Sequence, residues 1–590
     1  MRTGLGVGIG MGMRARRGEA TPSPITIDVA PSRTSGVAPL AVIFDARGTT
    51  CDDVDYPFRE LGYLWDFDDD DYSTFDGGTI GPVVSHVFDQ PGTYSVSVLV
   101  VNANGDVKSQ GVTITVSDPD TVFAGTLTTC VSTSGTFTGA PSGCTQVTSS
   151  DYDAALSTYG GSGKRVLFRR GETFVSSTAA TLTNTSEATI GAFGTGTSPD
   201  ARGIFTNAPV ISVMHNGSVH VLGSNPTTCT DLRVMDLAFS YDNGATPGHL
   251  FDLGYRADDL LIYRCTDVAS HAFDQNISIG DAAPASFGAD VCHNVCVANC
   301  YWNSGTNNDY GFYGAARGLS LLNTYWGPNQ SGSSGHVARV QFGRVVHIAG
   351  NTFAAAAATK HSLTVRALDW IDAPSEDDTD SRYVVCEGNS TNCGTVWAWH
   401  IGSESTGHRE HVDDVLILNN HFQIVSGGGT GSAYAIHSGG RRVVIANNTT
   451  NADGGVGITT VRLLLADTYG SAGQPAPESY VIGNTVFSAI ALSGNLRGVS
   501  QGAGTCEVRN NLLWGAAAVG SYTVTTGAAT FTSSNNLSAT DPLIVSSADL
   551  HLTASSPAIG AGIVSALSLR DRDSVLRVAT VDVGAYEYVS

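Results

Sequence analysis

A short apolar strand that ends in Asn or Asp returns about every 30 residues from residue 230 onward. Segments such as IAGNTF, ILNNHF and VIGNTVF show the pattern, in which a polar corner separates two apolar stretches. Strand-rich units at a regular period of this length are typical of a solenoid, in which each turn contacts its neighbours. The corner residues are Asp236, Asp267, Asn299, Asn323, Asn351, Asn389, Asn420, Asn448, Asn484, Asn511 and Asn536.

This repeat predicts a right-handed parallel β-helix. Two or three short strands per turn would pair with the turns above and below, about 4.8 Å apart. An Asn that recurs at one corner stacks as a ladder, because its amide donates to the next Asn and its backbone tolerates a tight left-handed turn. We therefore assign Asn299 to Asn536 to the scaffold. A leucine-rich repeat would need a Leu lattice that is absent, and a propeller blade usually takes about 40 residues or more.

A smaller β-unit precedes the solenoid. Residues 23–117 alternate apolar and polar residues in short strands, from ITIDVAP to VTITVSD, over the length of an immunoglobulin-like sandwich. The run Trp65, Asp66, Phe67 and Asp68, followed by HVFDQPGTY, resembles the PKD (polycystic kidney disease) domain in order and spacing, with Asp68 where that family has Gly. The resemblance implies a spacer, adhesion or carbohydrate-contact module without catalysis.

Two further segments resemble secreted and phage β-helix proteins related to the pectate-lyase superfamily. GKRVLFRRGETFV (163–175) is similar to their entry strand, and DPLIVSSADLHLTASSPAIGAG with DVGAYEY is similar to their closing segment. The expected fold class is all-β, with the sandwich at 23–117 and the β-helix at 118–590. The resemblance leaves the activity open, because the same scaffold serves lyases, hydrolases, epimerases and adhesins.

Residues 1–22 form a Gly-rich arm in which every second residue from Gly4 to Gly12 is glycine. Its basic cluster follows the apolar stretch, which is the reverse of a secretory signal. The alternation suits a strand with one bare face that lies close to another backbone. The arm resembles the start of some tailed-phage structural proteins, which implies docking to virion or cell-surface proteins. A flexible leader or an atypical export signal is the alternative.

Charge and motifs exclude several function classes. The chain has 31 Lys and Arg against 54 Asp and Glu, a formal charge of −23. A nucleic-acid partner is not expected, because such a surface needs basic patches. No apolar stretch of about 18 residues occurs, so no membrane span is expected. No Walker A loop, dinucleotide-binding fingerprint or HExxH motif is present.

Four consecutive aspartates, Asp68, Asp69, Asp70 and Asp71, follow the aromatic motif of the sandwich. Clustered carboxylates on a loop supply the hard oxygen ligands that Ca²⁺ prefers, so this run is a candidate calcium site. The alternative is a solvated acidic turn.

Three cysteines at a spacing of four, Cys292, Cys296 and Cys300, raise a zinc hypothesis. The alternative is that they pack in the core as small apolar residues.

The strands that follow the corners carry the candidate chemistry. Aligning LTVRALDW, TVWAWHIG, AYAIHSGG and GITTVRLL places Asp369, His400, His437 and Arg462 in one column on successive turns. If this column faces solvent, a carboxylate and two imidazoles stand in line for proton transfer beside an acidic sugar. We predict Asp369, His400 and His437 as catalytic residues.

Residues around this column are predicted to contact carbohydrate. Aromatic faces stack on sugar rings, and the insertions between turns add acidic residues at the edge, where paired carboxylates would suit glycoside hydrolysis. The alternative is that these polar groups are solvated and the aromatic rings belong to the core. The predicted contacts are Arg366, Trp397, Trp399, Tyr434, Arg462, Glu410 and Asp413.

Three functional hypotheses remain open. The first is a virion-surface protein of tail-spike or fibre type that recognises host polysaccharide, with depolymerase activity undecided and a homotrimer as one expected assembly. The second is a secreted polysaccharide lyase or glycoside hydrolase with an accessory PKD domain. The third is a non-catalytic adhesin. All three take a polysaccharide as partner and act at a virion surface, a cell surface or outside the cell.

Overall fold

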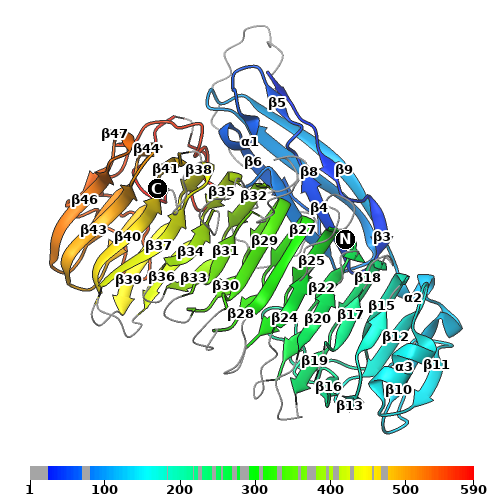
Figure 1. The fold of residues 1–590 in the computed structure, drawn as a ribbon. Coiled ribbons are helices and arrows are strands. Elements are labelled where there is room, and N and C mark those ends of the chain that lie inside the picture. The colour runs from blue at the N-terminus through cyan, green and yellow to red at the C-terminus, as the bar shows by residue number, and fades with distance from the viewer. Residues whose placement is uncertain are drawn as a thin grey trace.

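The computed structural model contains a β-sandwich that lies along the side of a long parallel β-helix (Figure 1). This confirms the predicted all-β class. The N-terminal arm lies outside the described residues. The structure describes residues 24–589 except 70–79, 183, 217, 223–228, 242–247, 254–256, 269–274, 280–290, 304–309, 329–334, 357–359, 368–379, 394–396, 403–410, 426–430, 455–457, 467–475 and 578.

Two sheets make the sandwich, with strand orders β2-β4-β7 and β3-β9-β8-β6, and the short pair β1-β5 stands beside them. Trp65 packs in its core with its ring centroid 5.6 Å from that of Phe44, and its Nε1 donates to the carbonyl of Gly81 at 2.9 Å. The elements are β1 (Ile25–Thr26), β2 (Ala30–Pro31), β3 (Ser35–Val37), β4 (Leu40–Asp45), β5 (Thr50–Cys51), α1 (Pro57–Glu60), β6 (Gly62–Asp66), β7 (Val83–Phe88), β8 (Gly92–Val101) and β9 (Val107–Ser117).

Each turn of the solenoid adds one strand to each of three faces. The first face, which follows the polar corner, is a 13-stranded parallel sheet among the described residues. Its strands are β13 (Thr173–Ser176), β16 (Val210–Val213), β19 (Ala238–Tyr241), β23 (Thr266–Asp267), β26 (Tyr301–Trp302), β28 (Tyr325–Trp326), β30 (Thr352–Phe353), β33 (Ser390–Cys393), β36 (His421–Val425), β39 (Thr449–Gly454), β42 (Thr485–Ser488), β45 (Leu512–Gly515) and β48 (Leu537–Ser538).

The second face comes next along each turn. It shares one continuous sheet with the third face, because two long strands, β27 and β29, pass from one to the other. The second-face strands are β14 (Ala180–Leu182), β17 (His220–Leu222), β20 (His249–Leu253), β24 (Gln275–Ile279), β27 (Tyr310–Leu322), β29 (Ala338–Ala349), β31 (Leu363–Val365), β34 (Trp397–Ile401), β37 (Gly431–Ser438), β40 (Ile458–Ala466), β43 (Leu492–Gln501) and β46 (Val519–Gly527).

The third face leads back to the polar corner and includes the C-terminal halves of β27 and β29. Its other strands are β10 (Thr128–Ser132), β11 (Thr145–Thr148), β12 (Arg165–Arg169), β15 (Ser186–Phe193), β18 (Cys229–Met235), β21 (Ala257–Asp258), β22 (Leu261–Tyr263), β25 (Cys292–Ala298), β32 (Ser381–Glu387), β35 (Val412–Leu418), β38 (Arg441–Ala446), β41 (Glu478–Ile482), β44 (Thr505–Arg509) and β47 (Thr530–Ser534).

A hydrogen-bonded ladder runs along the corner between the third and first faces. The backbone and the side-chain amide of Asn420, for example, both donate to Asn448 Oδ1, at 2.9 and 3.0 Å. The ladder continues through other side chains at Thr324, Cys300 and Cys265. The predicted stacking is confirmed for Asn351, Asn389, Asn420, Asn448, Asn484, Asn511 and Asn536.

Four predicted corner residues are not rungs. Asp236, Asn299 and Asn323 have left-handed backbones, with φ of 61°, 55° and 46°, and the last two directly precede the rungs Cys300 and Thr324. Asp267 lies two residues beyond the rung Cys265. Short polar side chains tolerate the left-handed backbone at which the chain turns. The prediction was wrong there because turn residues and rungs have the same chemistry.

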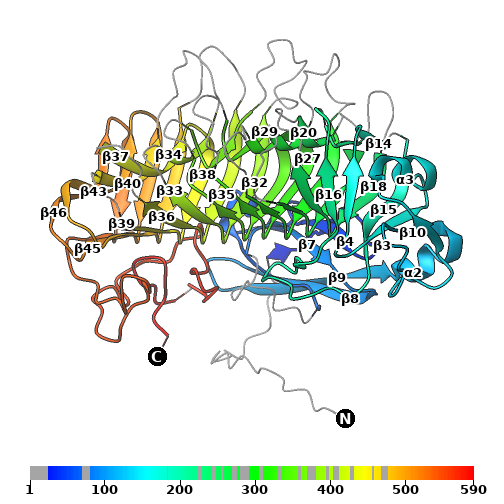
Figure 2. The ribbon, with the colours of Figure 1, turned by 90° about the horizontal axis from the view of Figure 1, so that it is seen from below.

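The sandwich covers the outer side of the third face (Figures 1 and 2). Side chains of β4 and β7 meet apolar side chains that point outward from the solenoid, so the two units share buried surface. The solenoid contributes Leu261, Tyr263, Cys296, Ala298, Leu322, Ala349, Val385, Leu416, Leu418, Val444, Ala446 and Ile482, and the sandwich contributes Ala41, Ile43, Ile80, Val83 and Val87.

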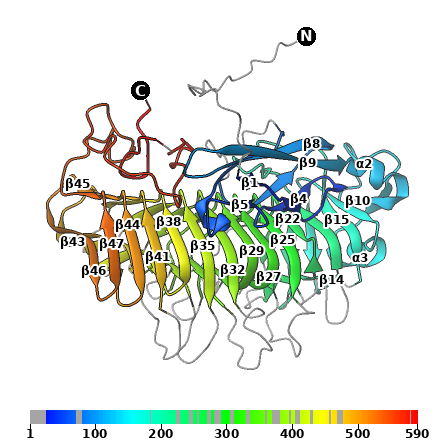
Figure 3. The same cartoon turned by 90° about the horizontal axis from the view of Figure 1, so that it is seen from above.

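The ends of the solenoid are closed differently. The N-terminal end follows α2 (Pro119–Val122) and a 3₁₀ turn, Gly125–Leu127, and is capped by α3 (Tyr152–Tyr159), which buries Tyr152 and Leu156 in the core. The C-terminal segment lies beside the sandwich (Figure 3). Among the described residues, no helix has the length and apolarity needed to cross a membrane.

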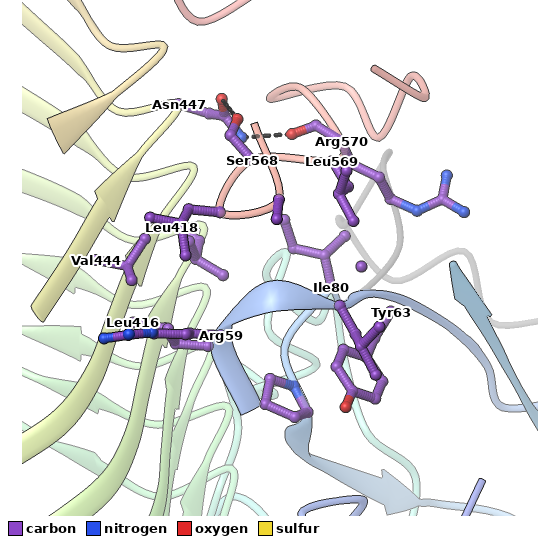
Figure 4. Close-up of a pocket in the computed structure, with 15 residues that line it drawn as sticks. Arg59, Tyr63, Ile80, Leu416, Leu418, Val444, Asn447, Ser568, Leu569 and Arg570 are labelled. Atoms are coloured by element: carbon purple, nitrogen blue, oxygen red, sulfur yellow. Dashed lines mark hydrogen bonds between the residues drawn. The ribbon is translucent and has the colours of Figure 1, made fainter. Parts of the chain in front are cut away.

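The sandwich, the solenoid and the C-terminal segment meet around a cavity of about 30 Å³ (Figure 4). Asn447 fastens the segment there: its Nδ2 donates to the carbonyl of Arg570 at 2.5 Å, and its Oδ1 accepts from Ser568 Oγ at 2.9 Å. The cavity has room for about one water molecule and not for a ligand.

A carboxyl group is buried in the first face at Asp267. Its side chain is 9% exposed, and the backbone N–H of Asn303 donates to its Oδ1 at 2.6 Å. Burial raises the pKa of Asp267 from 3.8 to about 6. The folded protein therefore holds this proton more tightly than the unfolded chain does.

We expect Asp267→Asn to remove a pH-dependent loss of stability. The favourable contribution of the protonated carboxyl is complete below pH 3.8 and is lost as the pH rises through about 6. Relative to the variant, the wild type should lose up to about 3 kcal/mol over this range. Urea unfolding across pH measures the difference, with Asp541→Asn on an exposed turn as control. A difference that does not change with pH contradicts the prediction.

Candidate functional site

The outer side of the second face carries a row of four histidines. The ring centroids of His336 and His361 are 5.0 Å apart, those of His361 and His400 are 5.4 Å apart, and those of His400 and His437 are 4.8 Å apart. They come from four successive turns of the solenoid, because each precedes or lies in a second-face strand. The row is buried, with exposures from 0% to 6%.

The pair at one end of the row is suited to proton transfer. The Nδ1 atoms of His400 and His437 lie 2.9 Å apart. A hydrogen bond between them requires that one ring carries a proton on Nδ1 and the other accepts it. A proton held in this way lies between two imidazole nitrogens, each of which can act as donor or acceptor.

The other end of the row is held neutral beside a cation. His336 Nδ1 accepts from the backbone N–H of His361 at 3.1 Å, and its Nε2 lies 3.4 Å from Arg366 Nη2. Burial, followed by the charges of His361, Arg366, Arg339 and Lys360, lowers the pKa of His336. His336 is therefore an uncharged ring next to a permanently charged guanidinium.

Half-exposed tyrosine and arginine pairs flank the histidine row. On one side Arg339 lies 5.3 Å from the ring centroid of Tyr313. On the other side Arg462 lies 4.7 Å from the ring of Tyr434 and donates to its hydroxyl at 2.8 Å, and Arg497 pairs with Arg462 on the next turn. Aromatic rings and guanidinium groups are the surfaces that bind sugar rings and their carboxylates.

The strand register corrects the predicted column. His400 pairs with His437 as expected, but Thr364 occupies the position opposite His400 that was predicted for Asp369. Leu465 is opposite His437, and Arg462 is opposite Tyr434. The histidine column is also buried, whereas the prediction required it to face solvent.

Two predicted carbohydrate contacts are contradicted. Trp399 is fully buried in the solenoid core, where its Nε1 donates to Thr391 Oγ1 at 2.9 Å. Asp413 lies at the start of β35 with no exposed side-chain surface and accepts from Arg441 Nε at 2.8 Å. Asp413 therefore neutralises arginines of the scaffold. The ring face of Trp399 and the charge of Asp413 are therefore not available to a sugar.

The remaining predicted residues are only partly placed. Asp369 and Glu410 lie outside the described residues, as do Asp70 and Asp71. Trp397 is described through its backbone, which pairs with Tyr434. Tyr434 and Arg462 are half-buried in second-face strands, whereas Arg366 directly follows β31 and is 5% exposed; a sugar-binding role for the three stays a prediction.

The described part of the calcium candidate is engaged within the sandwich. Asp69 Oδ2 lies 2.5 Å from His86 Nε2, and Asp68 Oδ2 accepts from the backbone N–H of Ser95 at 2.8 Å. No group of three or more metal-ligating side chains occurs among the described residues. Calcium binding by the full aspartate run stays a prediction.

The three spaced cysteines do not converge on a metal. Cys300 is a rung of the ladder and Cys292 Sγ accepts from the backbone N–H of Ala257, both inside the solenoid. Cys296 points outward, under the sandwich. A spacing of four would put the three side chains on one face of an extended strand, but the left-handed residues Asn294 and Asn299 interrupt the alternation. The structure therefore contradicts the zinc hypothesis.

His336, His361, Arg339 and Tyr313 were not predicted from the sequence. The segments GHVARV and KHSLTV each place a histidine two residues before a second-face strand. Aligning the turns on this start of the strand, instead of on its end, would have brought the two histidines to the site.

Comparison with known proteins supports the assignment of the sandwich. Residues 26–116 match the family model of the PKD domain. No curated protein sequence matches the chain. A structure of carbohydrate-binding modules from the β-sandwich superfamily is 25% identical over 17% of this chain, with a TM-score of 0.15; the chain covers 37% of that structure.

Two solved structures align with most of the chain. The tailspike protein of E. coli bacteriophage HK620, a mutant in complex with a pentasaccharide, is 13% identical, covers 67% of this chain and 78% of its own, and has a TM-score of 0.41. The family 28 exopolygalacturonase of Yersinia enterocolitica is 10% identical, covers 87% and 99%, and has a TM-score of 0.34. The β-helix assignment itself rests on the parallel strand pairing.

Proposed function

We propose that this protein binds an extended acidic polysaccharide along the outer side of the second face. The observation that carries the proposal is the pair of tyrosine and arginine clusters, Tyr313 with Arg339 and Tyr434 with Arg462. Four steps of about 4.8 Å separate their turns, roughly 19 Å, which suits a chain of several sugar units and not a monosaccharide.

The charge of this surface favours an acidic ligand. The chain as a whole has a formal charge of −23. The strand pairing defines two columns of residues that point outward from the second face, and neither contains an acidic residue. The first runs through Tyr313, Arg339, Thr364, His400, His437, Leu465, Ser500 and Thr526, and the second through Trp397, Tyr434, Arg462, Arg497 and Thr523. Both columns contain arginine. A cationic strip on an acidic protein selects anionic chains by attraction there and by repulsion elsewhere.

The position of the strip supports the same conclusion. Long connections, residues 366–380, 402–411 and 467–477, join the second face to the third, whereas Gly388 and Asn389 alone turn the corner from the third face to the first. The sandwich covers the third face. Binding residues are often carried by long loops of a rigid scaffold, and these three connections begin at the ends of second-face strands.

Binding to polygalacturonate and alginate, compared with neutral dextran, tests the proposal. We expect Arg339→Gln and Arg462→Gln each to weaken binding of the acidic polymers about tenfold, because each removes a charge-assisted contact of roughly 1.4 kcal/mol. Arg202→Gln, which removes an arginine on another side of the molecule, is the matched control. Equal affinity for dextran, or no loss in the two variants, would sink the proposal.

A second candidate function is cleavage of the bound polysaccharide. The contact between His400 and His437 favours it, because a proton-sharing imidazole pair supplies both a base and an acid. We expect His400→Asn and His437→Asn each to lower the rate of cleavage by about 10²- to 10⁴-fold. New reducing ends and the ultraviolet absorbance of unsaturated uronate distinguish hydrolysis from elimination. Cleavage that persists in both variants would reject this pair as the catalytic one.

We further propose a virion-surface location, with the arm at residues 1–22 docking to the particle and a homotrimer as the assembly. A secreted monomer with an accessory PKD domain and a non-catalytic adhesin are the alternatives. The period-two glycine pattern supports docking of the arm. The mass of the purified protein in solution and its immunological detection on particles or in culture supernatant decide among these.

A further inference from the structure

A cleft of about 520 Å³ lies between the sandwich and the N-terminal end of the third face. It is on a different face of the solenoid from the polysaccharide surface proposed above. Strand β15 forms its floor, and the turns around Pro39 and Pro91 of the sandwich form its roof. Pockets of this size at domain boundaries are characteristic of small-ligand sites.

The floor contains a buried hydroxyl that the protein does not satisfy. Thr189 lines the cleft, is 5% exposed, and its Oγ1 has no hydrogen-bond partner among the described residues. Leaving a buried hydroxyl unpaired costs about 1–3 kcal/mol, so such a group calls for a partner from outside the chain. Two residues further along the same strand, Gly191 leaves the floor open: a Cβ there would lie 3.2 Å from Met235 Cγ.

A second unsatisfied group stands next to the cleft. Arg170 stacks on the lining residue Phe205 at 4.3 Å, and its Nη2 donates to Asp236 at 3.0 Å. Its Nη1 is buried without a partner in the described part of the chain. One unsatisfied polar atom thus lies in the lining of the cleft and a second lies directly behind its lining residue Phe205, which packing alone does not explain.

The remaining lining indicates a neutral, amphiphilic ligand. The guanidinium of Arg264 is paired with Asp89 and Asp236, and that of Arg165 with Asp120, so neither has an excess charge to offer an anion. The charges that line the cleft therefore cancel. Its hydrogen-bonding side chains are interspersed with apolar ones. The apolar lining consists of Ala38, Pro39, Pro91, Pro119, Leu167, Ala192, Phe205 and Met235.

From this lining we propose that the cleft is a second carbohydrate site, which binds a neutral sugar unit of one or two rings. The C–H faces of a pyranose pack on the prolines and Met235, while its hydroxyls reach Thr189, Gln90 and the paired guanidiniums. The site stands independently of the polysaccharide surface on the second face. It makes the sandwich one wall of a binding site instead of a spacer.

Calorimetric titration with cellobiose, maltose and N,N′-diacetylchitobiose tests this site. At least one should bind, and Thr189→Val should weaken its affinity about fivefold, the effect of one hydrogen bond. Gly191→Leu fills the cleft and should abolish binding. Thr113→Val, on exposed strand β9, is the matched control and should bind as the wild type does. Thr189→Val removes a hydroxyl that makes no hydrogen bond within the described part of the protein, so this variant is expected to fold. It therefore tests the site even if Gly191→Leu misfolds.

Failure of all three sugars to bind overturns the proposal, as does binding that Thr189→Val leaves unchanged. Affinity that falls with Arg462→Gln but not with Thr189→Val places the sugar on the second face, and this outcome also overturns the cleft. Loss of polygalacturonate binding in the second-face variants concerns only the polysaccharide surface. The two proposals therefore fail separately.

Discussion

Asn448→Ala is expected to lower the free energy of unfolding by about 3–5 kcal/mol, although the residue touches no predicted ligand. Asn448 has no exposed surface. Its Oδ1 accepts two hydrogen bonds from Asn420, and its Nδ2 donates to the carbonyls of Ile417 and Ala446 and to Asn484 Oδ1. Truncation to alanine leaves the buried backbone N–H of Asn420 without a hydrogen-bond acceptor and opens a cavity at the corner.

The ladder itself supplies the control for this prediction. Thr324 occupies a rung, where its Oγ1 accepts from the backbone N–H of Cys300 at 3.2 Å and donates to the carbonyl of Leu322 at 2.8 Å. Asn448→Thr keeps the equivalent pair of bonds to Asn420 and Ala446. We expect it to cost about 1–2 kcal/mol, less than half of the alanine effect.

Urea unfolding followed by circular dichroism measures both variants. A loss below about 1 kcal/mol for Asn448→Ala would show that the corner relaxes and that the ladder is incidental to stability. A threonine variant as unstable as the alanine variant would show that the amide bonds to Ile417 and Asn484, which threonine cannot make, carry the stabilisation.

The ladder was predictable from sequence because stacking requires the same side chain at the same place on every turn. Asn351 and its successors repeat for that reason. The earlier rungs at Cys265, Cys300 and Thr324 were missed, since thiol and hydroxyl groups make similar bonds from different residue types. Turn residues such as Asn299 and Asn323 were taken for rungs because asparagine also suits the left-handed backbone.

The site was less predictable than the fold. Connections of unequal length separate the turns, so a sequence alignment of LTVRALDW with TVWAWHIG has no fixed origin. A shift in register changes which side chain is paired and which face it occupies. This placed Asp369 opposite His400, where Thr364 stands, and it put Arg462 in the wrong column. The pairing of His400 with His437 was correct because in both segments the histidine is followed by one residue and then by glycine at the end of the strand.

The sandwich and the solenoid are joined by contacts that no local pattern indicates. Ser85 and Ile80 belong to the sandwich, yet their backbone N–H groups donate to side chains of the solenoid: Ser85 to His347 Nδ1 at 2.8 Å and Ile80 to Glu387 Oε2 at 3.1 Å. His347 Nε2 in turn donates to Glu387 Oε1 at 2.8 Å. Both side chains lie within strands that otherwise face the apolar sandwich, 262 and 307 residues from their partners.

We therefore expect Glu387→Ala to cost about 3–5 kcal/mol, because removing one member of a buried pair leaves the other unpaired. The Glu387 and His347 side chains are 3% and 2% exposed, and the Ile80 N–H would also lose its acceptor. The matched control is Glu478→Ala, which removes a carboxylate 33% exposed at the rim of the same interface, 3.5 Å from Arg59. A pair of this exposure contributes about 1 kcal/mol or less.

The shape of the unfolding curve gives the sharper test of this interface. Amide hydrogen exchange in β8, an inner strand of the sandwich, reports on the sandwich, while circular dichroism reports mainly on the solenoid. Where the two units share a desolvated interface, both signals should change in one transition in the wild type and in Glu478→Ala. In Glu387→Ala the sandwich signal should change at a lower urea concentration. Two separate transitions already in the wild type would show that the interface contributes little and that the sandwich is an independent module.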